Sequence, residues 1–427
     1  MNPKRLVRKV VPKSAVKGLE KGYRGSRSQF WQAKYGYPAR KLKVIAVTGT
    51  NGKTTTSSYV NSVLMAAGLK TAVYTTAFFE IGGKRTPNHT HMTVTSQASV
   101  QRFFAKARDA GVDWVIMEVT SMALHQGRVG GLKPEIGIVT NLTQDHLDYH
   151  KTMEKYASAK ALLFTKYHAK QAVLNGDDEW FDFFAERAGV EPIVIGKTDK
   201  ATLQLNGMEN TAHGSKFSVT FAGKHVDFTT RLLGKFNVYN ALCAIAVGEI
   251  LGLDRKNIVA GVADLEAVPG RMEQINAGQS FAVLVDFAYT PDALENALMT
   301  LRPLTNGKLR IVFGATGDRD KSKRRAMGQV VGKLAEAIYL TDDETYTEDP
   351  VAIRDMVYEG LVDLKAQAKT QVIDDRLDAI KQAFSDAKKG DTVLLTGIGH
   401  ENYRNMGGKK LPWDEREVAR ELLAKIL

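Results

Sequence analysis

Cysteine is almost missing from this chain of 427 residues, which contains only Cys243. A single cysteine excludes an intramolecular disulfide, and its place in the apolar run ALCAIAVGEIL predicts a buried core residue. The chain also lacks a run of about 18 apolar residues, so no transmembrane helix is predicted. No continuous apolar segment follows the basic N-terminal residues, as a signal peptide would require. These absences make a cytoplasmic location the default expectation.

Acidic residues are nearly absent from residues 1–43, where Glu20 stands against thirteen lysines and arginines. This basic arm accounts for the whole net charge of +12, because the rest of the chain has 46 basic and 46 acidic residues. Its mixture of basic and apolar residues indicates contact with an anionic membrane surface or an acidic partner. An equally good interpretation is a solvated arm whose aromatic residues pack on the body. No nucleic-acid partner is predicted, since no binding motif accompanies the charge.

Strand-like and helix-like segments alternate from residue 44 onward. The runs KVIAVTG, TAVYTT, DWVIMEVTS, EIGIVTNL and QAVLNGDD are apolar and rich in β-branched residues, and they end in polar residues or glycine. Helical patterns such as SVQRFFAKARDAG lie between them. This alternation predicts an α/β fold with a mostly parallel sheet that is covered by helices on both faces. Functional residues are then expected at the carboxyl ends of the strands.

A change of pattern divides the chain into two folded units. FSVTFAGKHVDFTTRLL reads as a β-hairpin, and the helix NVYNALCAIAVGEILG follows it. After VPGRME a second α/β unit begins, with FAVLVDFAY, KLRIVFGAT, EAIYLTDD and DTVLLTGIG as strands. We therefore predict a basic N-terminal arm over residues 1–43, a central ATP-binding domain over 44–268 and a C-terminal Rossmann-like α/β domain over 269–427.

Residues 47–56 read VTGTNGKTTT and lie between a predicted strand and a predicted helix. The stretch is a shortened form, G-x-x-G-K-T, of the phosphate-binding pattern. Gly49 and Gly52 let backbone N–H groups face phosphate, and the following helix adds the positive end of its dipole. Lys53 is expected to reach the terminal phosphates and Thr54 to bind Mg²⁺. The central domain is therefore predicted to be a P-loop ATPase domain.

Two further motifs follow predicted strands and are expected near this loop. MEVTS carries Glu118, and NLTQDHLDYH carries His146. A carboxylate and an imidazole beside a triphosphate could bind Mg²⁺, although this ion prefers oxygen. Alone, each such residue at a strand end is more often a structural hydrogen-bonding group. The helix MEKYASAKALLF carries Lys160, which the residue pattern alone places on the surface.

Together these motifs resemble the Mur ligase family, the ATP-dependent ligases that build the peptide stem of peptidoglycan, and above all the UDP-N-acetylmuramoyl-tripeptide synthetase branch. The matching stretches run in family order over residues 44 to about 405. They are VTGTNGKTTT, MEVTS, QGRV, TNLTQDHLDYH with MEKYASAKALLF, LLGKFNVYNAL, PGRME, DFAYTPDAL, GDRDK and GIGHENY. The set covers most of the chain and is highly specific.

The resemblance implies a role for each matching residue. For ATP it implies Gly49, Thr50, Asn51, Gly52, Lys53, Thr54, Thr55, Asn240, Arg271, Asp286 and Lys321. For Mg²⁺ it implies Thr54, Glu118, His146 and Lys160, the last as a carbamylated lysine whose added carboxylate supports the metal. For the UDP-sugar peptide it implies Thr93, Ser121, Gln126 and Arg128. The implied catalytic set is Lys53, Glu118, His146, Lys160 and Arg271.

The resemblance also implies the chemistry. ATP phosphorylates a substrate carboxylate to give an acyl phosphate, an amino group attacks it, and an amide and inorganic phosphate are formed. The metal ions and Lys53 offset charge on the transferring phosphoryl group. Because the binding elements lie on separate domains, the domains are expected to close before chemistry.

Three features of the sequence depart from the family pattern. Relatives carry a folded domain that grips the uridine end, whereas 43 residues precede the first predicted strand here, so the UDP grip is expected to be reduced, replaced, absent or supplied by a partner. The T-T-P substrate motif reads Thr93-Val94-Thr95. Met122 and Tyr289 stand where the family has histidines.

A fourth departure concerns the incoming amino acid. Family members that select meso-diaminopimelate read it with D-N-P-R, and this chain has Asp343-Glu344-Thr345-Tyr346 instead. The arginine that clamps the distal carboxylate is missing, and arginine is hard to replace in bidentate recognition. We predict that meso-diaminopimelate is not the preferred amino acid, and that Asp343, Tyr346 and Glu401 line the amino-acid pocket.

Three hypotheses for the function follow. The leading one is an amide-forming ligase that acts on a UDP-MurNAc-peptide precursor. The second is a ligase of the same superfamily with another acid acceptor, of the folylpolyglutamate or poly-γ-glutamate type, which the short N-terminus favours and the NLTQDHLDYH to SAK match opposes. The third is a nucleotide-binding scaffold without ligase chemistry, which the complete catalytic set opposes. Phosphate release that depends on both an acid and an amine separates a ligase from a scaffold.

Overall fold

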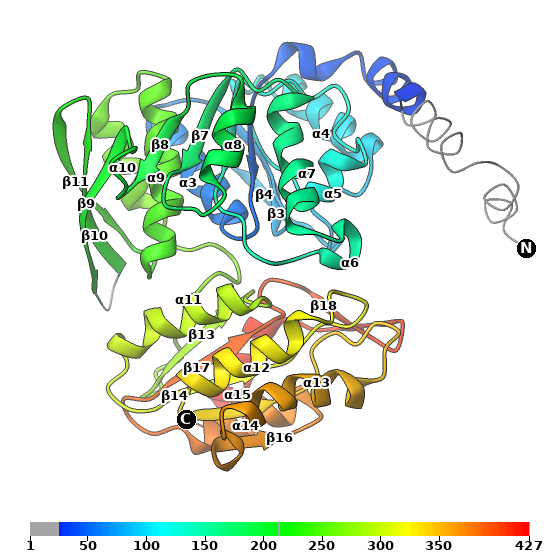
Figure 1. Cartoon of the computed structure of the whole chain (residues 1–427), viewed down its shortest axis with the longest axis vertical. Coiled ribbons are helices and arrows are strands. Elements are labelled where there is room, and N and C mark those ends of the chain that lie inside the picture. Colours follow the sequence, from blue (N-terminus) through cyan, green and yellow to red (C-terminus); the bar gives the residue numbers. More distant parts are fainter. Residues whose placement is uncertain (1–24, 212–213, 427) are drawn as a thin grey trace, which may run out of the picture.

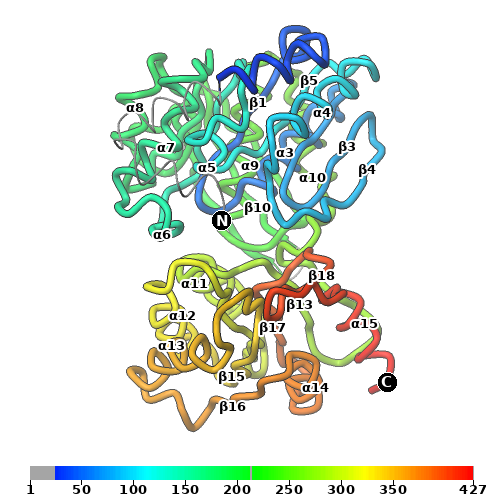
Figure 2. Tube along the Cα trace, turned by 90° about the vertical axis from the view of Figure 1, so that its right-hand side faces the viewer, coloured from blue at the N-terminus to red at the C-terminus, as the bar shows by residue number. Residues whose placement is uncertain are grey.

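Two α/β lobes make up the computed structural model, which describes residues 25–211 and 214–426 (Figure 1). The central lobe surrounds a large mixed sheet, and the C-terminal lobe surrounds a smaller one. A view turned by 90° shows the same two lobes stacked along the long axis of the molecule (Figure 2). No helix within these described ranges is long and apolar enough to cross a bilayer.

Eleven strands form the sheet of the central lobe, in the order β11-β10-β9-β8-β7-β6-β1-β5-β2-β3-β4. The strands from β9 to β2 in this order pair in parallel, and both edges are antiparallel hairpins. The bounds are β1 Lys43–Thr48, β2 Thr71–Tyr74, β3 Phe78–Ile81, β4 Lys84–Pro87, β5 Trp114–Glu118, β6 Ile136–Val139, β7 Gln171–Asn175, β8 Ile193–Gly196, β9 Leu203–Thr211, β10 Gly214–Phe221 and β11 Lys224–Thr230. The carboxyl ends of β1, β5 and β6, three neighbours, therefore meet at one edge.

Helices cover both faces of this sheet. One face carries α3 Lys53–Ala66, α9 Lys235–Ile250 and α10 Arg255–Asp264, and the other carries α4 Gln97–Asp109, α5 Ser121–His125, α7 Met153–Thr165 and α8 Phe181–Ala188, while the short α6 Leu147–His150 precedes α7. Strand β1 feeds both cores, because Ile45 and Val47 point to the first face and Val44 and Ala46 to the second. Burial on both sides explains its continuous apolar run.

The C-terminal lobe repeats the layered plan with six strands in the order β12-β13-β17-β14-β15-β16. Only β12 is antiparallel to its neighbour. The bounds are β12 Glu273–Ile275, β13 Ala282–Asp286, β14 Leu309–Phe313, β15 Ala337–Leu340, β16 Thr370–Val372 and β17 Thr392–Thr396, with a separate hairpin of β18 Tyr403–Met406 and β19 Lys409–Pro412. Helices α11 Pro291–Leu301, α12 Lys323–Leu334 and α13 Pro350–Asp363 cover one face, and α14 Arg376–Asp386 and α15 Glu415–Ile426 the other. Single 3₁₀ turns are η1 Pro38–Lys41, η2 Arg302–Leu304 and η3 Gln367–Lys369.

The described part of the predicted basic arm is a helix over residues 25–34 that packs on the central lobe. Ser28 packs closely against Gly130. A Cβ atom added to Gly130 would lie 1.9 Å from the Oγ of Ser28. Phe30 on the same helix remains 58% exposed. The first part of the arm, residues 1–24, lies outside the described residues, so contact of the arm with a membrane or an acidic partner stays a prediction.

The predicted fold class is confirmed. The central sheet is mostly parallel, a second α/β unit follows it, and every strand-like run named from the sequence contains a strand. The hairpin read from FSVTFAGKHVDFTTRLL is β10–β11. Sequence reasoning named no strand for β3, β4, β8, β9, β12 or β16, nor the hairpin β18–β19.

Candidate active site

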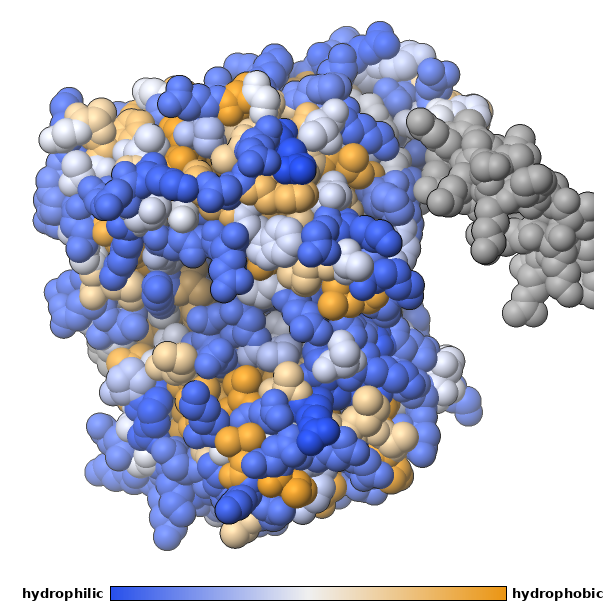
Figure 3. Space-filling model, in the orientation of Figure 1, coloured by the Kyte–Doolittle hydropathy of each residue, from blue (hydrophilic) through white to orange (hydrophobic). Residues whose placement is uncertain are grey.

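A cavity of about 440 Å³ lies at the junction of the two lobes, on a molecule whose surface around that junction is mostly hydrophilic (Figure 3). Of the residues predicted from the sequence, the structure brings together in its lining Thr50, Asn51, Gly52, Lys53, Thr54, Thr55, Thr93, Glu118, Arg128, His146, Asn240, Arg271, Asp286, Tyr346 and Glu401. Those outside the lining are Gly49, Ser121, Gln126, Lys160, Lys321 and Asp343. Lys321 pairs instead with Glu348 at 2.7 Å and is 61% exposed.

The phosphate loop joins β1 to α3 and depends on two glycines with positive φ. Gly49 has a φ of 152° and Gly52 a φ of 80°. A Cβ at Gly49 would lie 1.8 Å from Thr140 Oγ1, and one at Gly52 would lie 2.3 Å from Asn240 Oδ1, so a side chain fits at neither position. Helix α3 starts after Gly52 without a side-chain cap, which leaves the positive end of its dipole open to an anion.

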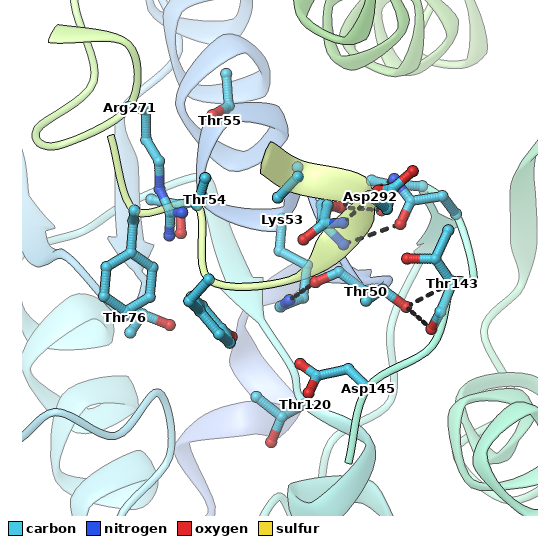
Figure 4. Close-up of a pocket in the computed structure, with 18 of the residues that line it drawn as sticks. Thr50, Lys53, Thr54, Thr55, Thr76, Thr120, Thr143, Asp145, Arg271 and Asp292 are labelled. Carbon is cyan, nitrogen blue, oxygen red and sulfur yellow. Dashed lines mark hydrogen bonds between the residues drawn. The ribbon is translucent and has the colours of Figure 1, made fainter. Parts of the chain in front are cut away.

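Lys53 is the first residue of α3, and its ammonium group is held against the loop (Figure 4). Nζ donates to the carbonyl oxygens of Gly49 at 3.1 Å and Thr50 at 2.7 Å. Burial lowers the pKa of Lys53, the charge of Arg271 lowers it further, and Glu118 opposes both. Phosphate over the loop would give this ammonium a stronger partner than two carbonyl groups.

Thr54 and Glu118 place a hydroxyl group and a carboxylate side by side at the loop. Thr54 Oγ1 donates to Glu118 Oε2 at 2.8 Å. The same carboxylate accepts from the backbone N–H of Thr76 at 3.0 Å and from its hydroxyl at 2.9 Å. Glu118 is only 2% exposed, so these donors fix its orientation toward the cavity.

Lys160 is buried, which corrects the surface position that its residue pattern predicts. The residue is 1% exposed, because α7 is covered on several sides by the sheet, α5 and α8. Its Nζ donates to Gly49 O at 2.7 Å and lies 4.4 Å from the ring centre of Tyr156. Burial and the charge of Lys53 lower the pKa of Lys160 well below that of an ordinary lysine. The side chain of Lys160 therefore points from α7 toward the phosphate loop.

The donors present fit Mg²⁺. His146, at a φ of 56°, has its Nε2 3.6 Å from Asp145 Oδ2, and burial lowers the pKa of its imidazole, which favours the neutral form that can bind a metal. No cluster of three or more His, Cys, Asp or Glu in the described part of the chain could hold a metal alone. This suits Mg²⁺, which is usually held by one or two protein groups together with phosphate and water. Thr54 and Glu118 supply the oxygen ligands that it prefers.

Arg271 enters the cavity from the segment between the lobes (Figure 4). Its guanidinium carbon lies 4.7 Å from the ring centre of Phe287, and its buried Nε has no hydrogen-bond acceptor in the part of the chain that the structure describes. Asp286, at the end of β13, accepts from the backbone N–H of Met272 at 2.7 Å. Burial raises the pKa of Asp286 to about 6. Arg271 is thus a half-buried cation with a buried Nε–H that an anion in the cavity could satisfy.

Thr93 and Arg128 line another part of the cavity wall. Arg128 donates from Nη1 to the carbonyl oxygen of Val94 at 2.9 Å and from Nε to Gln126 Oε1 at 2.8 Å. The hydroxyl group of Thr93 shares a short hydrogen bond with that of Thr76, the residue that also binds Glu118. This wall is therefore connected through Thr76 to the Glu118 carboxylate.

Acidic and aromatic residues form the part of the cavity in the C-terminal lobe. Tyr346 and Glu401 line it, as predicted residues, together with Glu344, and His91 from the central lobe contacts both glutamates. Asp343 lies behind them at 2% exposure, and burial raises its pKa to about 6. This end of the cavity is built from both lobes.

Direct contacts also join the two lobes elsewhere around the cavity. Lys323 Nζ at the start of α12 lies 3.2 Å from Asp145 Oδ1, and both side chains are buried. Asn51 of the phosphate loop donates to Asp292 Oδ2 at 2.7 Å. Burial alone would raise the pKa of Asp145, but the charge of Lys323 and the backbone N–H of His146 hold it down at about 2. The two lobes are therefore closed on each other.

Comparison with known families matches both lobes. The family described as the Mur ligase middle domain matches residues 47–248, and the one described as the Mur ligase, glutamate ligase domain matches residues 270–399. The chain belongs to the Mur ligase family. It is an ATP-dependent ligase, as its relatives are.

Individual relatives of this Mur ligase carry a common name. The UDP-N-acetylmuramoyl-L-alanyl-D-glutamate–2,6-diaminopimelate ligase of Geobacillus kaustophilus is 41% identical over 398 residues, covering 90% of this chain and 80% of that protein. The ligase of the same name from Nostoc sp. is 40% identical, covering 92% and 79%. A solved structure of a protein of this name is 32% identical with a TM-score of 0.64, covering 94% and 83%. The solved structure of folylpolyglutamate synthase of Mycobacterium tuberculosis shares the fold. It is 19% identical with a TM-score of 0.72, covering 87% of this chain and 92% of that one.

Sequence reasoning missed several residues of this Mur ligase site. His91 lines the cavity without belonging to any quoted motif. Arg319 also lines it and stands inside GDRDK, the motif from which only Lys321 was chosen. Glu344 stands inside the quoted D-E-T-Y motif, so its charge was a usable signal. Ser121 Oγ is 2.9 Å from Nε2 of His150, whose place in NLTQDHLDYH was the only hint of that contact.

Proposed function

We propose that this Mur ligase joins an amino acid to a carboxylate of a UDP-MurNAc-peptide at the expense of ATP, in peptidoglycan synthesis. The observation that carries the proposal is one cavity that receives the phosphate loop, the guanidinium group of Arg271 and an acidic pocket from the other lobe. The names of relatives about 40% identical support UDP-MurNAc-L-Ala-D-Glu as the acceptor. A cytoplasmic location, where ATP is available, stays a prediction.

The reaction has two steps. In the first, an oxygen of the acceptor carboxylate attacks the γ-phosphorus of ATP, the phosphoanhydride bond breaks, and ADP leaves. Lys53 and Arg271 offset the negative charge that spreads over the transferring group. In the second, the amino nitrogen attacks the acyl carbon, the bond from that carbon to the phosphate oxygen breaks, and an amide, inorganic phosphate and a proton are released. The closed lobes keep out water that would hydrolyse the acyl phosphate.

Thr54, Glu118 and His146 are our proposed Mg²⁺ ligands. Bound there, the ion would neutralise phosphate charge during transfer. We propose that Lys160 acts as a carbamate. Its lowered pKa supports this, because a neutral amine is the form that adds CO₂ and releases a proton. The product is an anion within reach of the loop.

The proposed acceptor site consists of Thr93, Ser121, Gln126 and Arg128. Arg128 supplies the positive charge that a UDP-peptide requires. For the amino acid, the relatives carry 2,6-diaminopimelate in their names, yet Tyr346 stands where the D-N-P-R motif has its arginine. We therefore keep the expectation that meso-diaminopimelate is not preferred here.

The test is phosphate release from ATP with UDP-MurNAc-L-Ala-D-Glu and a panel of single amino acids, with the products weighed by mass spectrometry. A mass gain on the acceptor of one amino acid minus one water confirms the ligase. ATP binding without a product from any amino acid points to another acid acceptor or to a partner subunit. Phosphate release that never depends on an acid and an amine together contradicts the proposal.

A further inference from the structure

The last part of the basic arm, residues 25–43, presents aromatic side chains to solvent among cations. Phe30, on the helix over residues 25–34, is 58% exposed, and Tyr37, just before η1, is 36% exposed. Single exposed apolar residues are normal on a protein surface. Two large aromatic rings on one short segment that holds five basic residues and no acidic one form a denser group, which calls for a physical reason.

The cations of this segment contact aromatic rings. Lys34 Nζ lies 5.0 Å from the ring centre of Trp31. The guanidinium carbon of Arg40 lies 4.2 Å from the ring centre of Tyr37. Trp31 in turn packs edge-on against Phe30, with ring centres 5.1 Å apart. Within the described ranges, neither Lys34 nor Arg40 has a carboxylate within ion-pair distance, so an external anion can approach both.

The other side of this segment is fixed to the central lobe, so the exposed rings keep their direction. The hydroxyl group of Tyr35 accepts from Arg102 Nε at 3.3 Å, and its carbonyl oxygen accepts from Arg108 Nη1 at 3.0 Å. Gln32 packs on Gly131, where an added Cβ would lie 2.4 Å from Gln32 Oε1. Arg102 of α4 is itself exposed and extends the positive surface beyond the segment.

The position of the segment leaves the active site open. Figures 1 and 2 both show the helix over residues 25–34 at the end of the central lobe that lies away from the C-terminal lobe. The cavity with the phosphate loop lies instead at the junction of the two lobes. A large partner can therefore cover the aromatic and basic surface without covering the cavity.

A lipid bilayer with anionic head groups fits these features. Aromatic rings, and cations on long apolar stems, lie at the head-group level of a bilayer. Each lysine or arginine beside an anionic bilayer strengthens binding about fivefold. Residues 1–24 add eight such cations to the five in residues 25–43. A bilayer receives many cations without a matched position for each, which suits this arm better than a single acidic protein does.

We propose that the surface formed by residues 25–43 docks on an anionic lipid bilayer. Phe30 and Tyr37 enter the head-group region, and Lys34 and Arg40 meet lipid phosphates there. The binding is peripheral and reversible, because it combines a small apolar contact with a polybasic segment. It is independent of the proposed ligase chemistry and adds a place where that chemistry is carried out.

The first experiment is sedimentation of the full-length protein with lipid vesicles. Vesicles of phosphatidylglycerol and phosphatidylcholine should carry the protein into the pellet at about 0.1 M salt. At about 1 M salt the binding should fall at least about tenfold, because the Debye length shortens from about 10 Å to about 3 Å. Vesicles of phosphatidylcholine alone should leave the protein in the supernatant. Equal binding to both kinds of vesicle, or to neither, overturns the proposal, and the second result leaves an acidic protein as the partner.

The second experiment separates this surface from the charge of the whole chain. Phe30→Ser should weaken binding to the anionic vesicles about tenfold, because the ring no longer enters the head-group region. The triple variant Lys34→Gln/Arg40→Gln/Lys41→Gln should weaken it about 100-fold. Unchanged midpoints of thermal unfolding check that the variants are folded, and the triple variant replaces only exposed side chains.

Matched controls lie on the C-terminal lobe. Met299→Ser removes another apolar side chain, which is 59% exposed, and is the control for Phe30→Ser. Lys388→Gln/Lys389→Gln/Lys425→Gln removes three exposed charges and is the control for the triple variant. Both controls should bind the vesicles as the parent protein does. Arm variants that bind as tightly as the parent, or controls that lose as much binding as the arm variants, would contradict docking through this surface.

Discussion

At the scale of single residues, the environment of Lys160 decides its chemistry. A helical lysine with no special neighbours is a surface cation, and the sequence offers no reason to treat this one differently. The fold buries it against the phosphate loop, beside a second ammonium group. Two like charges without solvent favour loss of a proton, which gives the neutral amine that the proposed carbamate requires.

The first prediction follows from this burial. Lys160→Ala is expected to lower kcat about 100-fold, because it would remove the proposed carbamate anion beside the metal. Short carboxylates such as acetate or formate should restore part of the activity by occupying the space left by the side chain. Steady-state phosphate release with and without added carboxylate measures both effects.

The control for this prediction lies on the same helix. Lys155 of α7 is exposed, and Lys155→Ala should keep its activity with or without carboxylate. Unchanged activity of Lys160→Ala would refute the carbamate. Loss of activity that no carboxylate restores would leave only a structural role for the ammonium.

A second prediction concerns the buried ion pair of Arg376 and Glu415, both 0% exposed. Arg376 Nη2 lies 2.6 Å from Glu415 Oε1 and also donates to Thr396 O at 2.6 Å, which ties α14 and α15 to β17. Arg376→Met should lower the free energy of unfolding by about 3–5 kcal/mol, since it leaves a buried carboxylate unpaired. Lys381→Ala, which breaks an exposed pair on the same helix, should cost less than about 1 kcal/mol. Urea titrations of both variants measure the free energy of unfolding. An equally small decrease in both would mean that Glu415 finds another hydrogen-bond donor.

At the scale of elements, two glycines set the distance between α12 and α13. A Cβ at Gly328 of α12 would lie 2.0 Å from Val357 O, and one at Gly360 of α13 would lie 2.0 Å from Arg325 O. Each helix thus rests directly on the backbone of the other. Each glycine destabilises its helix by about 1 kcal/mol relative to alanine, and the close packing of the two helices offsets this cost.

The third prediction tests that approach. Gly328→Ala and Gly360→Ala should each destabilise the protein by about 3 kcal/mol, because a methyl group must push two backbones apart. Gly332→Ala is the matched control on α12, since its Cβ would meet only side-chain carbons, at 3.3 Å and beyond. The free energy of unfolding of Gly332→Ala should lie within about 1 kcal/mol of that of the parent protein, because the gain in helix propensity offsets the tight contact. Thermal unfolding of the three variants measures the difference, and equal midpoints would contradict it.

The sequence predicts elements well where burial leaves a pattern and poorly where it does not. Strands such as β1 and β17 are buried on both faces, so their apolar runs are unmistakable. The missed β4 and β19 are exposed at every residue and carry no hydrophobic alternation. Edge strands of this kind form because a neighbour offers backbone hydrogen bonds, which the sequence does not display.

The candidate site divides in the same way. The phosphate loop is a local motif, and a short peptide of sequence is enough to predict it. The group of His91, Glu344 and Glu401 depends on segments from two lobes, more than 250 residues apart in the chain, meeting at one place. No local pattern marks such a meeting, and only the closed arrangement of the lobes reveals it.

At the scale of the whole molecule, the pair of Lys323 and Asp145 connects closure to the catalytic loop. Lys323→Gln should open the lobes, because the closed state would then bury Asp145 without its cation at a cost of about 3–5 kcal/mol. We expect kcat to fall at least tenfold, and small-angle scattering with a non-hydrolysable ATP analogue to show a larger radius of gyration. Lys333→Gln, at an exposed position of the same helix, is the control and should change neither.

The pH dependence of closure distinguishes this pair from a merely steric contact. In the parent protein the pKa of Asp145 is held at about 2, below its ordinary value of 3.8, so its contribution to closure is complete above about pH 4 and is lost as pH falls toward 2. Closure of the parent should therefore be constant between pH 6 and about 8. Without Lys323, burial is expected to raise the pKa of Asp145 above 3.8, and protonation then removes the buried charge. The Lys323→Gln variant should consequently close better as pH falls from about 7 to 5, whereas an opening that is the same at both pH values would show that the lysine acts by its shape and not by its charge.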